Sequence, residues 1–311
     1  MVDLSGLSES LRQRVVASAT GPFQHAPYPL ARTLAYPGDP GLFGPGSVSW
    51  TVIGDASTFA GGIRALLVQA AHPEVVAGVA DHSRYREDPL GRLSRTSAYV
   101  TATTYGAIPE VEHAVALVRR AHRTVVGTSH RGKAYTADTA EFAAWVHNAL
   151  TDSFLATYQT YAPTPLAERD ADRFVEEQTK VGRLLGADPL PTTARELRLW
   201  MATHPSASPS PGMVEALSFL ESPPLTPGVR AGYQVLFHAA VSTIPARLRS
   251  VLGLSPRPGA RRAGRAAVGF LRWALGASPS WHLALVRTGS PIPQGLFRQP
   301  LPLDRLEQRA S

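Results

Sequence analysis

The sequence predicts an all-α protein, and three features support this prediction. Apolar residues recur at the three- and four-residue spacing of amphipathic helices through most of the 311-residue chain. The 27 Pro and 26 Gly gather between these segments and near the ends, as turn formers do. No segment shows the sustained alternation that marks a β-strand. We therefore expect one all-α domain over residues 1–311, with helices joined by long ordered loops.

The composition narrows the classes of site that the chain can hold. Hydrophobic residues make up 44% and charged residues 18%, which is typical of soluble globular proteins. The absence of cysteine excludes disulfides, thiolate nucleophiles, iron–sulfur clusters, Cys-ligated zinc and covalently attached haem. No uninterrupted apolar run approaches the roughly 20 residues of a membrane-spanning helix. Because no secretory signal is visible either, we expect a cytoplasmic protein.

The N-terminal part is predicted to be irregular over residues 1–50, apart from a short helix over residues 8–19. A helix capped by Asp55 or Ser57 follows, and Pro73 should break it, because proline removes a backbone donor and crowds the preceding turn. A second short helix then continues to about residue 80. The next helix, over residues 92–105, ends at Gly106.

One face of the helix over residues 92–105 is polar throughout. Arg92, Thr96, Tyr99 and Thr103 follow one another at helical spacing and therefore share this face. Such a face either points to water or lines a polar pocket. Arg92 and Thr96, one turn apart, have the chemistry to bind a carboxylate or a small oxygen species, whereas structurally Arg92 would cap a neighbouring helix or pair with Asp88.

A histidine on an apolar helix face is the sharpest single feature. In the helix predicted over residues 109–126, His122 continues the apolar series of Val111, Val115 and Val118. It is either a hydrogen-bonded core residue or a metal ligand that offers a neutral imidazole nitrogen. The helix predicted over residues 139–158 is apolar nearly all round and belongs in the centre of the domain; the same alternatives apply to its His147.

The remaining chain continues the helical pattern. Helices are expected over residues 165–186, from a cap at Thr192 or Thr193, over residues 213–222, over residues 227–252 with a break at Pro245, and over residues 260–276. The tail from Ser278 is predicted to be irregular.

The C-terminal region, residues 222–303, is strongly basic. It contains ten Arg and no acid. Such a surface suits an anionic membrane, nucleic acid or an acidic protein. The alternative, which we favour, is a solvated rim together with arginines that pair with acids from the first two thirds of the chain.

Three segments together resemble one known family. AGGIRALLVQAAHPEVVAGVADHSRYREDPLGRLSRTSAYVTATTYG, VRRAH and WVHNALTDSF, in this order and spacing, resemble the MpaB-like oxygenase family, which includes rubber oxygenases. The resemblance spans roughly residues 41–254. It implies an all-α fold with a globin-related helical core in the haem-bearing members. It also implies non-covalent b-type haem and the use of dioxygen to cleave carbon–carbon double bonds in isoprenoid chains.

The resemblance also assigns roles to residues. Matching VRRAH makes His122 the proximal haem ligand. The run from Arg92 to Thr96 matches an R-x-x-K-T pattern with Arg95 in place of Lys; because arginine stays protonated, it is a poor ligand for the distal iron position. We take Arg92, Arg95 and Thr96 as candidate catalytic residues, and His122, Arg92, Thr96 and His147 as candidate haem-binding residues. The family's acidic residue near the haem is not placed by the sequence.

The resulting hypothesis is a haem b-dependent oxygenase that acts with dioxygen on an apolar small molecule, for which the resemblance suggests an isoprenoid-type double bond as the point of cleavage. Two alternatives stay open: a non-enzymatic helical protein that carries haem or a lipid-like ligand, and a haem-free enzyme on the same fold. We expect no nucleic-acid partner and no transmembrane segment, and at most a weak contact between the basic C-terminal region and an anionic membrane.

Overall fold

Helices form almost all of the regular structure. The computed structural model describes residues 4–306 and confirms the all-α prediction. In chain order the helices are α1 (Leu4–Thr20), α2 (Val48–Gly54), α3 (Thr58–Gln69), α4 (Pro73–His82), α5 (Pro89–Tyr105), α6 (Ile108–His122), α7 (Ala140–Tyr161), α8 (Glu168–Leu184), α9 (Ala194–Thr203), α10 (Pro211–Glu221), α11 (Pro227–Thr243), α12 (Ala246–Leu252), α13 (Ala260–Leu275) and α14 (Pro279–Thr288).

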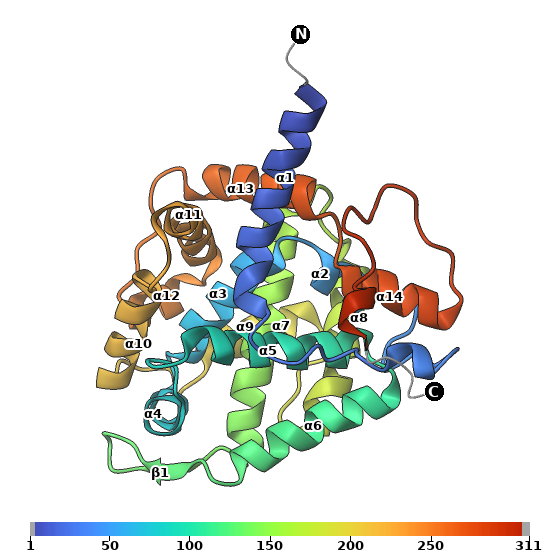
Figure 1. Cartoon of the computed structure of the whole chain (residues 1–311). Coiled ribbons are helices and arrows are strands. Elements are labelled where there is room, and N and C mark those ends of the chain that lie inside the picture. The colour runs from blue at the N-terminus through green and yellow to red at the C-terminus, as the bar shows by residue number, and fades with distance from the viewer. Residues whose placement is uncertain (1–3, 307–311) are drawn as a thin grey trace.

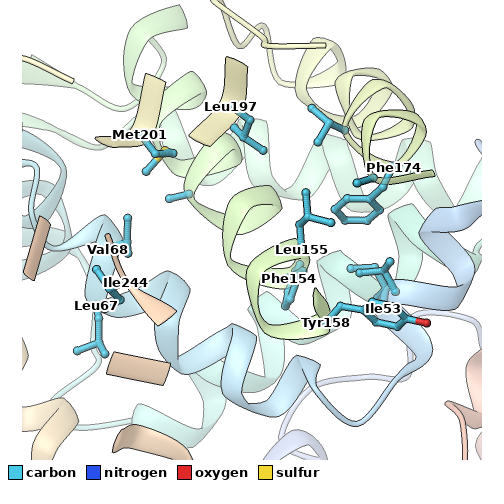
Figure 2. Close-up of a cluster of buried hydrophobic side chains, with 14 of the residues drawn as sticks. Ile53, Leu67, Val68, Phe154, Leu155, Tyr158, Phe174, Leu197, Met201 and Ile244 are labelled. Atoms are coloured by element: carbon cyan, nitrogen blue, oxygen red, sulfur yellow. The ribbon is translucent and has the colours of Figure 1, made fainter. Parts of the chain in front are cut away.

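The long helix α7 is the central element. It rises through the middle of the molecule, with α5 lying across it, β1 and α6 near its start, and α13 near its end (Figure 1). Its side chains are buried on nearly every face, as its apolar sequence predicts. Figure 2 shows Phe154 and Leu155 of α7 within a core to which α2, α3, α8 and α9 also contribute.

Two predicted proline breaks are confirmed. Helix α3 ends at Gln69 and α4 begins at Pro73, where the missing N–H of proline costs nothing because the first turn has no acceptor for it. Likewise α11 ends at Thr243 and α12 begins at Ala246, immediately after Pro245.

The structure corrects the prediction in four places. Helix α1 is longer than the predicted residues 8–19, and α2 lies in a stretch assigned to loop. An antiparallel pair, β1 (Val126–Thr128) and β2 (Ala134–Thr136), replaces the end of one predicted helix. The tail from Ser278 is not irregular throughout, because α14 begins directly after it, with the Ser278 side chain accepting a hydrogen bond from Ser280 N.

Within residues 4–306 no single helix combines the length and hydropathy needed to cross a bilayer. Helices α2 and α3 meet both criteria only when taken together, and they are bent by 91° at their junction.

Candidate functional site

Helices α5 and α6 form a hairpin, with Arg92 near the start of α5 and His122 at the end of α6, both far from the joint. The helices join at Gly106 and Ala107, and at a rise of about 1.5 Å per residue both Arg92 and His122 lie about 20 Å from this joint. Figure 1 shows the two helices diverging from the joint, with α6 running towards β1.

The joint is held by a dense set of hydrogen bonds. The Trp50 indole donates to Thr104 O at 2.8 Å, and the Tyr105 hydroxyl donates to Trp50 O at 2.8 Å. The buried guanidinium of Arg287 donates to Tyr105 O at 2.6 Å, and Ala107 N donates to the Glu110 carboxylate at 3.0 Å. These bonds fix the direction in which α5 and α6 leave the joint.

Arg92 is a half-buried cation that has no acidic partner in the part of the chain that the structure describes. Asp88, the partner considered from the sequence, caps α5 by accepting from Gly91 N at 2.9 Å and pairs with Arg95 at 3.2 Å instead. The Arg92 guanidinium lies 5.8 Å from the ring centre of Tyr85 and makes no hydrogen bond or ion pair with the described residues. Burial lowers its pKa, although arginine stays charged at neutral pH. An anion brought to Arg92 would therefore find an unoccupied set of donors.

Arg95 and Thr96 lie on the outside of α5. Both side chains are exposed, and the Thr96 hydroxyl donates to Arg92 O of its own helix at 3.1 Å. Their assignment as catalytic residues stays a prediction.

His122 is the last residue of α6 and is half-buried. Burial lowers the pKa of its imidazole, with the carboxylate of Asp138 raising it to a smaller extent. Its ring makes no hydrogen bond with the described residues. The predominant form at neutral pH is thus a neutral imidazole with a free nitrogen lone pair, which is the form that ligates metals. The predicted position on the helix is confirmed, and its role as a ligand stays a prediction.

His147 and Tyr99 border one small cavity between α2, α5, α7 and α8. Its volume is about 20 Å³, which is room for one water molecule. The Nε2 atom of fully buried His147 lies 3.4 Å from the Thr151 hydroxyl, and the Tyr99 hydroxyl is buried without a hydrogen-bond partner. This cavity borders neither Arg92 nor His122, so the structure brings Tyr99 and His147 together but separates them from the open end of the hairpin.

The unpartnered hydroxyl leads to a prediction. Tyr99→Phe should leave the free energy of unfolding unchanged or raise it by up to about 1 kcal/mol, because a buried hydroxyl without a partner costs desolvation. Tyr105→Phe is the matched control: it removes a made bond, that to Trp50 O, and should cost about 1–2 kcal/mol. Urea unfolding measures both. If Tyr99→Phe is as destabilising as the control, its hydroxyl has a partner in solution.

His72 is also a buried histidine. The sequence did not indicate which side chains surround it. Its side chain is fully buried, and neither ring nitrogen has a hydrogen-bond partner. Nδ1 lies 3.5 Å from Glu74 Oε2, and the rings of Phe142, Trp145 and His204 surround it. Among residues 4–306, no three His, Asp or Glu side chains come together as a metal site.

His72 and His147 predict acid-sensitive folding. Burial lowers the pKa of each imidazole to about 4, whereas histidine in an unfolded chain titrates near about 6.5. Between these values the unfolded chain binds more protons. The free energy of unfolding should therefore fall as the pH drops from about 6.5 to about 4, by up to about 1.4 kcal/mol per pH unit for each imidazole. Urea unfolding across this window should show a shallower slope in His147→Gln; an unchanged slope would contradict the assignment.

A comparison with protein families shows to which family this chain belongs. The family model described as "ER-bound oxygenase mpaB/B'/Rubber oxygenase, catalytic domain" matches residues 50–273. The chain belongs to this family. The match to the MpaB/rubber oxygenase family runs from α2 to α13 and includes every candidate site residue named above. Comparisons with curated proteins and with solved structures found no match.

Proposed function

We propose that this member of the oxygenase family is a haem b-dependent oxygenase that acts on an apolar small molecule. The observation that carries the proposal is the neutral, half-buried imidazole of His122 at the end of α6; near the start of α5, Arg92 adds a cation that has no acidic partner among residues 4–306. The family match supports the oxygenase part, because it names a catalytic domain of oxygenases.

The residues present fit a non-covalent haem. A porphyrin supplies four ligands to its iron, so one protein imidazole is sufficient as an axial ligand. His122 would hold the iron through its free nitrogen, and Arg92 would donate hydrogen bonds to a propionate or to another anionic group. The chain has no cysteine for covalent attachment. Haem, when bound, supplies the activation of dioxygen.

The chain's own residues would bind the cofactor, orient the substrate and keep water out of the site. His122 stays neutral at neutral pH, so no proton has to leave before it binds a metal. Tyr99 and His147 border the small cavity behind α5, where they can hold one polar molecule and no larger ligand. The proposed substrate is apolar and carries an isoprenoid-type double bond, by analogy with the rubber oxygenase that the family description names.

An absorption spectrum of the purified full-length chain tests this proposal. It is recorded as isolated, after addition of haem, and after reduction. We expect a Soret band that shifts on reduction. A colourless protein that ignores added haem would remove the cofactor from the proposal. Oxygen consumption with apolar alkenes then separates an oxygenase from a protein that only carries haem.

A further inference from the structure

Most arginines of the basic C-terminal region have no acidic partner among residues 4–306. Of the ten arginines between Glu221 and Asp304, only two lie within 4.0 Å of a carboxylate of the described residues. Arg272 Nε lies 2.7 Å from Asp55 Oδ2, and Arg287 Nη1 lies 4.0 Å from Glu110 Oε2. Pairing with acids from the first two thirds of the chain therefore accounts for two of the ten arginines, and the other eight belong to the solvated rim or contact uncharged groups.

The remaining arginines keep their full charge. Arg247, Arg261 and Arg265 donate to backbone carbonyls, at 3.0 Å to Ala202 O, 3.1 Å to Ser242 O and 3.0 Å to Thr160 O respectively. A carbonyl accepts a hydrogen bond but carries no net charge. The exposed side chains of Arg257 and Arg262 make no hydrogen bond or ion pair with the described residues. A positive potential therefore covers this part of the surface.

Helix α13 combines this charge with exposed aromatic rings. Arg262, Ala266, Phe270 and Trp273 follow one another at helical spacing and share its outer face. The Phe270 side chain is 45% exposed and stacks on Trp273 with ring centres 5.5 Å apart.

The inner face of α13 is fixed against α11. A side chain on Gly264 would approach Ala239 Cβ to 2.5 Å, and Val268 is fully buried. Helix α13 therefore cannot turn Phe270 inwards without losing this close packing. Its outer face is a permanent feature of the surface.

We propose that the outer face of α13 docks on a membrane that carries anionic lipids. Arginines near a bilayer are attracted to anionic headgroups, and Phe and Trp side chains insert at headgroup level. In this arrangement α13 lies on the surface without crossing it. Figure 1 places α13 and α1 at one end of the molecule, and β1 and α6 near the other. Docking through α13 therefore leaves the open end of the α5–α6 hairpin uncovered.

The composition of this face favours lipid over nucleic acid. Its residues are Arg262, Ala266, Phe270 and Trp273, so one arginine is the only group on this face that can contact phosphates or base edges, and no Ser, Thr, Asn or Gln side chain supports it. Aromatic rings that bind single strands stack on bases, whereas Phe270 and Trp273 already stack on each other at an interplanar angle of 23°.

Vesicle sedimentation of the full-length chain tests the proposal. The probes are phosphatidylcholine vesicles and vesicles in which about a third of the lipid is phosphatidylserine. We expect binding only to the anionic vesicles, and weaker binding as salt rises, because salt screens surface charges. Equal binding to both vesicles, or no binding to either, would overturn the proposal. So would binding to duplex DNA without binding to vesicles.

Variants of α13 link the binding to this face. Arg262→Glu and Phe270→Ser should each weaken partitioning on the order of tenfold. Matched controls are Arg123→Glu, also exposed, and Leu199→Ser, where the side chain is 61% exposed on α9. Circular dichroism melting checks that all four fold. If the controls weaken binding as much as the α13 variants, the charge of the whole chain, and not this face, is responsible. The result does not depend on haem.

Discussion

His122→Ala is expected to abolish haem retention. The variant removes the imidazole at the end of α6 that, in our proposal, is the protein's axial ligand to the iron. Loss of an axial ligand should weaken haem binding by at least roughly ten- to a hundredfold, by comparison with changes to groups that only support ligands. Titration of the apoprotein with haem, followed at the Soret band, measures the affinity. The proposal predicts that the band is lost or greatly weakened.

The neighbouring His113 provides a matched control. It lies on the same helix and is exposed, so His113→Ala should bind haem as the unchanged protein does. Added imidazole should partly restore the spectrum of His122→Ala, because it can occupy the space left by the side chain. Rescue of this kind separates a missing ligand from a misfolded pocket. A His122→Ala variant that binds haem with an unchanged spectrum would return His122 to a structural role.

The same experiment can show whether another histidine holds the haem instead of His122. His147 and His72 are more deeply buried than His122, and burial lowers the pKa of each to about 4. Both are therefore neutral and chemically able to ligate, but each is enclosed by packed side chains. If haem binding survives in His122→Ala and is lost in His147→Ala, the cofactor lies near α7 instead of at the open end of the hairpin.

Periodicity located the helices that pack through a continuous apolar face. Helices α5 to α8 and α13 were predicted from spacing, because an amphipathic face records the direction of the core in each local window. Helix α2 was missed because its stability comes from distant contacts: Glu177 of α8 accepts from Ser49 N at 2.8 Å at its start. Helix α14 has local start and stop signals, namely Ser278 as cap, Pro279 at the first position and Gly289 after the end, so the prediction of an irregular tail was wrong for this segment.

The candidate site, like the fold, was predictable only where the information lay within one helix. The shared face of Arg92 and Tyr99 followed from helical spacing. The sequence did not indicate which charges would pair, because Asp88 is close in sequence to both Arg92 and Arg95. In the structure Asp88 pairs with Arg95. The proposed roles of Arg95 and Thr96 rest on the resemblance, and their exposure depends on how α5 packs against its neighbouring elements. Spacing within one helix carries no information about that orientation.

The buried pair Arg64–Asp152 illustrates what local patterns omit. Arg64 lies in α3 and Asp152 in α7, so no sequence window contains both. Arg64 Nη2 lies 2.6 Å from Asp152 Oδ2, the side chains are 1% and 9% exposed, and Arg64 Nη1 also donates to the Ser153 hydroxyl at 2.8 Å. The pair crosses the interface between the two central helices.

Breaking this pair should cost more stability than any surface change. Asp152→Asn leaves the Arg64 guanidinium buried without a counter-charge, and loss of one partner of a buried ion pair costs about 3–5 kcal/mol. Arg86→Ala is the control, since its pair with Glu215 is exposed and should contribute less than about 1 kcal/mol. Urea unfolding measures both variants.

The double variant Arg64→Met with Asp152→Leu distinguishes charge from packing. If the cost of Asp152→Asn arises from an uncompensated charge, replacing both partners by apolar side chains should recover much of the lost stability. If the losses of stability from Arg64→Met alone and from Asp152→Leu alone add up in the double variant, shape and not charge pairing holds α3 against α7. The coupling between the two residues therefore reports why a protein with an apolar central helix retains an ion pair in its core.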